Sequence, residues 1–190
     1  MPIRLAFELA ADRDAWEAAR RPRIVVLPHS RPFVDGLWAR RAFPDAAVYC
    51  RWWPAWLARL APRWCLQVTP HRDWVDAQAE TLRDTDRCCV AFPSGGRGAW
   101  KTGSFRIAAA SGAALFAAVF ARDGTVAHLS LVAHGPPRAP GEDCRRRARQ
   151  TRDAALRKVR GMLRAHGCAA PGLLYRALRA LGAYADEAYH

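Results

Sequence analysis

The sequence lacks any apolar run long enough to cross a membrane, since no window of about 18 uncharged apolar residues occurs among its 190 positions. Arg4 and Glu8 stand near its start, where a secretory signal peptide needs an unbroken apolar segment. Internal repeats and low-complexity tracts are also missing. We therefore expect a cytoplasmic protein that meets membranes only peripherally, on the inner or cytosolic face.

The cysteines lack the paired spacing of a metal or redox motif, and no histidine cluster lies beside them. They are Cys50, Cys65, Cys88, Cys89, Cys144 and Cys168. Such isolated cysteines usually behave as small hydrophobic side chains in the reduced state. We expect neither a disulfide nor a metal held by cysteine.

Acidic residues are few, because 17 Asp and Glu face 30 Lys and Arg, which gives a formal net charge of +13. This excess indicates an anionic partner: nucleic acid, an anionic membrane surface or small negatively charged substrates. At 190 residues and 51% hydrophobic, the chain suits a single α/β core. We expect an α/β domain over residues 1–141 and a basic helical extension over 142–190, packed on the same domain.

Short apolar runs predict strands, and stretches with helical patterning lie between them. The predicted strands cover residues 23–27, 65–68, 87–92, 115–120 and 126–132. The predicted helices cover residues 11–20, with Trp16 on the buried side, and 74–82, 103–111, 142–164 and 171–188. Together they favour a mostly parallel central sheet flanked by helices. Asp123-Gly124 is typical of a hairpin turn, so the strand at 126–132 should pair antiparallel at the sheet's edge.

A glycine-rich loop, Pro93 to Gly98 (PSGGRG), follows the strand that ends at Phe92 and precedes a helix. A turn of this composition exposes several backbone N–H groups beside one cation, Arg97. Such groups form a binding site for an anion such as phosphate.

A second candidate site follows the strand at 23–27, where His29 is succeeded by Asp35. Open α/β sheets place reactive groups at the carboxyl ends of their strands. A lone loop histidine is more often held by backbone hydrogen bonds, but the nearby acid favours a functional pair.

These two segments resemble the glycerolipid (lysophosphatidic acid) acyltransferase family. FPSGGRG followed by KTGSFRIA is similar to that family's Phe-Pro-Glu-Gly-Thr-Arg-Ser block and its trailing Lys-Gly-Ala-Phe-Arg segment. Ser94 stands where the family has Glu, and Gly96 where it has Thr. The likeness covers roughly residues 23–135, and His29 precedes Arg97 by 68 residues, a separation typical of the family.

The resemblance implies an acyltransferase-like fold that moves a fatty acyl group from acyl-CoA or acyl carrier protein to a lysophospholipid such as lysophosphatidic acid, in phospholipid biosynthesis or remodelling. It implies His29 as general base and Asp35 as the carboxylate that orients it. Five residues separate this pair instead of the family's four, and Pro28 replaces its usual Asn. No metal or organic cofactor is implied. The residues implied to bind the acceptor phosphate are Arg72, Ser94, Gly95, Gly96 and Arg97.

His71 and Asp76 match the family's spacing literally, but we interpret them as a coincidence. His71 lies only 26 residues before Arg97, too few for the intervening strands and helices. Arg72 instead follows a predicted strand, as a second phosphate contact would, although an ordinary helix N-terminus explains this segment equally well.

Residues 51–64 interleave tryptophans with arginines. Trp52, Trp53 and Trp56 are our candidates for membrane contact, because indole rings favour the membrane interface. The same residues suit stacking on single-stranded bases, or burial in the core. The arginine-rich segment 142–164 is either a solvated helix face or a cationic surface against anionic lipid.

Three functions follow in order of preference. We expect an active acyltransferase, with anionic membrane as a peripheral partner and nucleic acid not expected. Because Ser94 replaces a glutamate and the His29–Asp35 spacing is longer, a catalytically silent lipid-binding relative is the first alternative. A basic nucleic-acid-binding protein is the second.

Overall fold

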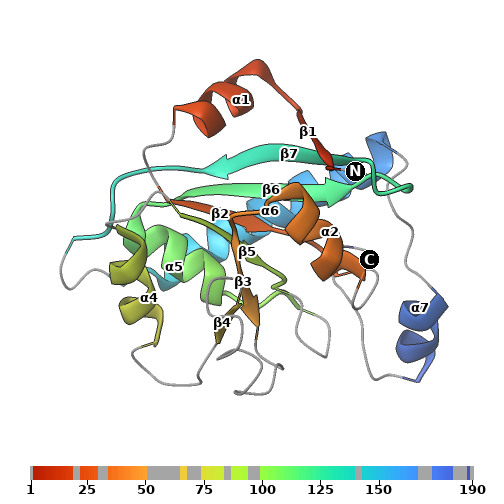
Figure 1. The fold of residues 1–190 in the computed structure, drawn as a ribbon. Coiled ribbons are helices and arrows are strands. Elements are labelled where there is room, and N and C mark those ends of the chain that lie inside the picture. The colour runs from red at the N-terminus through yellow and green to blue at the C-terminus, as the bar shows by residue number, and fades with distance from the viewer. Residues whose placement is uncertain are drawn as a thin grey trace.

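A seven-stranded sheet forms the centre of the described part of the protein, in the order β1-β7-β6-β2-β5-β3-β4 (Figure 1). The structure, a computed structural model, describes residues 2–18, 22–29, 34–50, 65–67, 74–83, 87–93, 99–139, 143–166, 173–181 and 188. The strands are β1 (Arg4–Phe7), β2 (Arg23–Val26), β3 (Ala47–Cys50), β4 (Cys65–Gln67), β5 (Cys88–Ala91), β6 (Ala114–Phe120) and β7 (Val126–Ala133). The helices are α1 (Ala10–Glu17), α2 (Val34–Ala42), α4 (Trp74–Arg83), α5 (Gly103–Ser111), α6 (Arg145–Ala165) and α7 (Leu173–Ala180).

Most of the sheet is parallel, which confirms the predicted α/β class. Strands β6, β2, β5, β3 and β4 all run in one direction, and β7 pairs antiparallel with β6. The antiparallel pairing expected for residues 126–132 is therefore confirmed. Their predicted place at the edge is wrong, because β1 pairs parallel with β7 on its outer side. A four-residue strand such as β1 has little local signal, so only the pairing with β7 reveals it.

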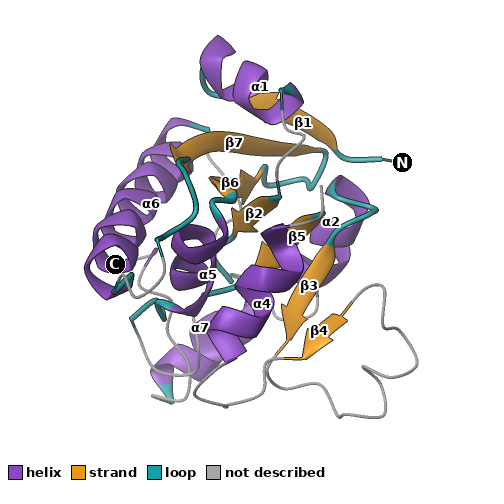
Figure 2. Ribbon diagram, turned by 90° about the vertical axis from the view of Figure 1, so that its left-hand side faces the viewer, coloured by secondary structure: helices purple, strands orange, loops and turns teal. Residues whose placement is uncertain are grey.

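The two faces of the sheet are covered by different helices (Figures 1 and 2). Along β6, Leu115 and Val119 belong to a core shared with α4, α5 and α6. Their neighbour Phe116 belongs to a second core with residues of α1 and α2. Side chains alternate between faces along a strand, so the continuous apolar run of β6 supplies both cores. The molecule is thus a three-layer α/β/α arrangement.

Helix α6 lies on the sheet with its apolar side inward. Ala148, Ala155, Val159 and Met162 are buried in the first core, whereas the arginines on the opposite side of the helix are exposed. Burial of this apolar stripe stabilises a helix whose sequence is otherwise strongly charged. This first part of the predicted 142–190 extension therefore belongs to one of the two helical layers.

Candidate active site

His29 and Asp35 lie together, with Nδ1 of the imidazole 3.1 Å from Oδ2 of the carboxylate. The side chain of Asp35 is only 2% exposed, while that of His29 is 24% exposed. The carboxylate is thus shielded from water, whereas the imidazole ring is partly open to solvent. This arrangement matches the pair predicted from the sequence, although five residues separate the two positions.

The end of β2 sets the position of His29. The N–H of Leu27 donates to the carbonyl of Ala91 at 3.0 Å, so the chain stays paired with β5 for one residue beyond Val26. Pro28 has no N–H to continue the ladder. His29 therefore comes just beyond the carboxyl end of a central parallel strand, where α/β folds place functional groups.

Helix α2 sets the position of Asp35, which lies in its first turn. A carboxylate there is favoured by the positive end of the helix dipole. The extra residue between His29 and Asp35 does not rotate the acid away from the imidazole, because the acid lies at the very start of the helix. A displacement by one position would misdirect the acid only if both residues were on one regular helix.

Trp38 fixes α2 against the β6–β7 turn. Its ring meets that of Phe120 edge to face, with centroids 5.5 Å apart. Gly124 in the turn has φ +72°, and a Cβ added there would lie 2.5 Å from Trp38. The turn glycine thus allows both the left-handed backbone and the close approach of the indole.

The aromatic ring of Phe92 packs against His29, with centroids 4.9 Å apart and planes at 50°. Phe92 and Pro93 follow β5, and the sequence joins Pro93 directly to Ser94 of the glycine-rich segment. The N–H of Lys101 donates to the carbonyl of Pro93 at 3.0 Å, so the chain returns to the same place after that segment. The residues that flank the glycine-rich segment therefore lie near the His29–Asp35 pair.

The remaining predicted site residues lie outside the described residues. These are the phosphate-binding candidates Arg72, Ser94, Gly95, Gly96 and Arg97 and the membrane-contact candidates Trp52, Trp53 and Trp56. Their roles remain predictions.

The cysteines of β5 offer no competing nucleophile at neutral pH. Burial raises the pKa of the Cys88 thiol to about 12 and that of Cys89 to about 11. Both, like Cys144, are unpaired thiols. A neutral, buried thiol is a poor nucleophile, so these residues act as core side chains.

Two aromatic residues, Phe92 and Trp38, hold the pair in place by contacts that the sequence patterns do not predict. Phe92 is predicted as the end of a strand and the first residue of the FPSGGRG motif, without a contact to His29, and Trp38 is given no role. The one available signal for Trp38 was its spacing of three residues after Asp35, which places both on neighbouring positions of a helix surface.

No known protein-family model matches this chain, and comparison with curated proteins finds no match either. Among the described helices, none has the length and apolar character needed to span a bilayer.

Proposed function

We propose that this protein is an O-acyltransferase that moves a fatty acyl group from an acyl thioester to the hydroxyl of a lysophospholipid. The observation that carries the proposal is the 3.1 Å contact between His29 and Asp35 at the carboxyl end of β2. The likeness of the two sequence motifs to glycerolipid acyltransferases supports the choice of reaction.

The pair is suited to general base catalysis. When the proton of the imidazole lies on Nδ1 and faces Asp35, Nε2 carries the lone pair. Nε2 takes the proton of the acceptor hydroxyl while the hydroxyl oxygen bonds to the thioester carbonyl carbon. The tetrahedral intermediate then collapses and the C–S bond breaks. The departing thiolate takes the proton from the imidazolium, which returns His29 to its neutral form. The products are an acylated acceptor and a free thiol.

Asp35 has two effects on this step. Its carboxylate holds the imidazole in the tautomer that leaves Nε2 basic, and its charge stabilises the imidazolium that forms. Because the carboxylate is 2% exposed, water screens this interaction little. The orientation of His29 is further restricted by Phe92, which follows the adjacent strand β5.

The glycine-rich segment is the proposed site for the acceptor phosphate. Pro93 and Lys101, which flank this segment, are hydrogen-bonded to each other. Phe92, the residue before Pro93, packs on His29. The net charge of +13 favours the approach of acceptors and donors that both carry phosphate. Ser94 replaces the family's Glu, so the resemblance specifies the reaction more closely than it specifies the headgroup of the acceptor.

A thiol-release assay tests the reaction. Acyl-CoA is mixed with the protein and a series of lysophospholipids, and free CoA is measured. We expect acceptor-dependent release that falls by about 10²–10⁴-fold in His29→Ala. His134→Ala is the matched control, because His134 is an exposed histidine just beyond β7. Release that persists in His29→Ala, or no release with any acceptor, contradicts the proposal.

A catalytically silent lipid-binding protein is the second candidate, favoured by the outer face of α6. Arg146, Arg149, Arg157 and Arg164 recur there at helical spacing and are exposed. Such a stripe suits an anionic bilayer, to which each basic residue near the surface adds about 1 kcal/mol. Sedimentation with phosphatidylglycerol vesicles but not phosphatidylcholine vesicles, together with no CoA release, would support this candidate over the enzyme.

A further inference from the structure

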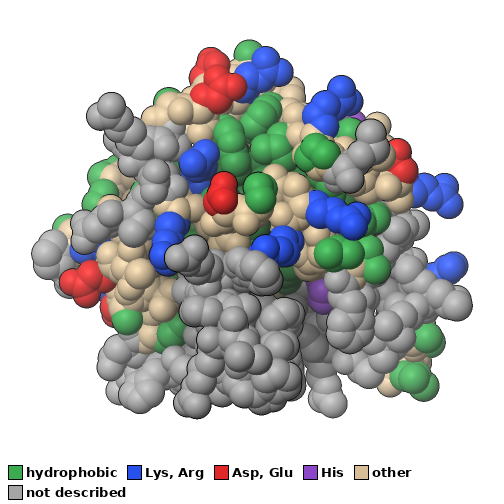
Figure 3. All heavy atoms as spheres, in the orientation of Figure 1, with side chains coloured by type: hydrophobic (Ala, Val, Ile, Leu, Met, Phe, Trp, Pro, Cys, Tyr) green, Lys and Arg blue, Asp and Glu red, His purple; other side chains and the backbone are tan. Residues whose placement is uncertain are grey.

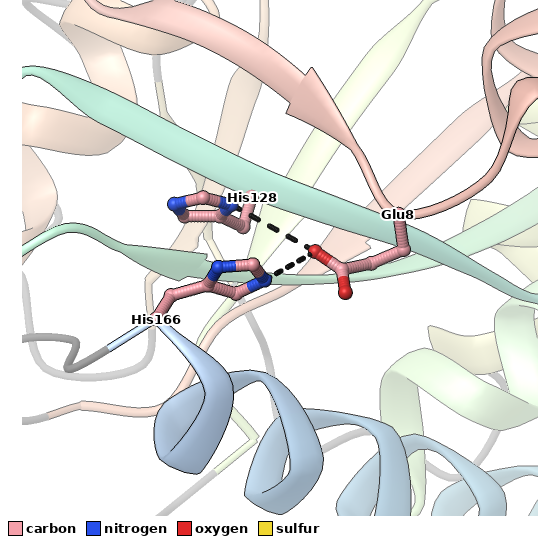
Figure 4. A group of neighbouring side chains, drawn as sticks. All are labelled: Glu8, His128 and His166. Atoms are coloured by element: carbon pink, nitrogen blue, oxygen red, sulfur yellow. Dashed lines mark hydrogen bonds and ion pairs between the residues drawn. The ribbon is translucent and has the colours of Figure 1, made fainter.

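Glu8, His128 and His166 converge at one place, although they are far apart in the sequence (Figure 4). Glu8 follows β1, His128 lies in β7 and His166 caps the carboxyl end of α6. Oε1 of Glu8 is 2.8 Å from Nε2 of His166 and 3.7 Å from Nδ1 of His128. One potential ligand atom from each residue lies within 4.8 Å of the other two.

The topology explains why the three side chains meet. Strand β1 pairs parallel with β7, and Ala6 is the partner of His128, so Glu8 lies two residues further along the same face. Helix α6 covers that face, as shown by the hydrogen bond from Lys158 Nζ to Ser130 Oγ of β7 at 2.8 Å. The end of α6 brings His166 over His128.

The two imidazole rings of the cluster lie against each other. The rings of His128 and His166 are stacked, with centroids 3.8 Å apart and planes at 12°. A neutral imidazole carries the lone pair that a metal ion requires.

We propose that Glu8, His128 and His166 form a binding site for a divalent transition-metal ion, zinc in particular. Two imidazoles and one carboxylate are a donor set that zinc uses with a water molecule in the fourth position. Ligand atoms around a tetrahedral zinc ion lie about 3.3 Å apart, given bond lengths of about 2.0–2.2 Å. The distances from the Glu8 oxygen to the two nitrogens lie on either side of that value.

Modest rearrangement completes the site. An imidazole binds a metal in the plane of its ring, so the two stacked rings tilt apart when the ion enters. Nε2 of His166 must present its lone pair to the ion, so a proton on that atom has to move to Nδ1 before the ion binds. The side chains are 17–29% exposed, which gives them room to turn and leaves the fourth position open to water.

A bound ion would join the start of the sheet to the end of α6. Glu8 and His166 are separated by 158 positions, and the ion would tie β1 and β7 to the end of α6. The site is separate from the proposed acyl-transfer site, because β6 lies between β7, which carries His128, and β2, the strand that leads to His29.

Metal titration tests the site on the full chain without a polyhistidine tag, after removal of bound metal with a chelator. Zn²⁺ binding is measured by calorimetry, and Co²⁺ binding by its visible absorption. We expect one ion per chain and a higher melting temperature with Zn²⁺. Glu8→Gln and His166→Gln should each weaken binding at least tenfold and abolish the rise in melting temperature. His134→Gln should bind as the unchanged protein does.

Circular dichroism shows whether each variant is folded, and His128→Gln provides a third ligand variant. Absence of Zn²⁺ binding by the unchanged protein overturns the proposal. Unchanged affinity in the folded ligand variants also overturns it, as does a Co²⁺ spectrum with thiolate charge-transfer bands, which would assign the ion to cysteine.

Discussion

The imidazole of His29 packs on the ring of Phe92, so the two segments that resemble acyltransferase motifs meet just beyond the carboxyl ends of the adjacent strands β2 and β5. The contact joins the catalytic candidate to the residue that precedes the glycine-rich segment. The proposed chemistry at one and the proposed binding at the other would therefore be linked through a few side chains.

Asp35→Asn tests the proposed base. The amide keeps the size of the side chain but loses the charge that holds the Nδ1 proton and stabilises the imidazolium. We expect the turnover number for thiol release to fall by about 10²–10⁴-fold with little change in KM. Steady-state kinetics measures both, with Asp14→Asn on the exposed side of α1 as the control. Full activity of Asp35→Asn would rule out the pair as the catalytic centre.

Gly124→Ala should destabilise the protein. A left-handed backbone costs a residue with Cβ about 1–2 kcal/mol, and the new methyl group would also push on Trp38. Because Trp38 and Asp35 share α2, thiol release should fall too. Urea denaturation measures the free energy of unfolding.

Gly161→Ala is the matched control for that substitution. Gly161 is exposed in the interior of α6, where an added Cβ meets no atom within 4 Å. We expect a gain of about 1 kcal/mol from helix propensity. Equal effects of the two substitutions would contradict the assigned turn geometry.

The stability of the protein should depend on pH through His128. Its pKa is lowered in the folded state, so the unfolded chain binds the proton first as the pH falls. The contribution of His128 is complete above its unfolded pKa of about 6.5 and is lost as the pH falls from there through the folded value. Urea denaturation across this range should show a smaller slope in His128→Gln than in His134→Gln. Equal slopes would contradict the shift.

Cys88 and Cys89 should resist alkylation in the native protein. Burial raises the pKa values of both thiols to about 12 and 11, so almost no thiolate exists at pH 8. Mass spectrometry of peptides after iodoacetamide treatment measures each site separately. We expect modification at these two positions only after guanidinium chloride is added, and rapid native labelling of either would show that β5 opens.

Local patterns were sufficient where an element carries its own signal. The apolar run at Arg23–Leu27 predicts β2, and the long arginine-rich segment after residue 141 predicts α6. The turn at Asp123-Gly124 correctly predicted that β7 runs antiparallel to β6. These features depend on backbone propensity and side-chain periodicity, which a few neighbouring residues determine.

Tertiary structure decided the relationships between distant segments. The sequence by itself determined an α/β class, a histidine at the end of a buried strand and an acid shortly after it. It did not determine that α2 would begin so that Asp35 faces His29, that β1 would pair outside β7, or that Glu8 would reach two histidines. Each of these depends on packing between elements far apart along the chain, for which no single stretch of residues contains the information.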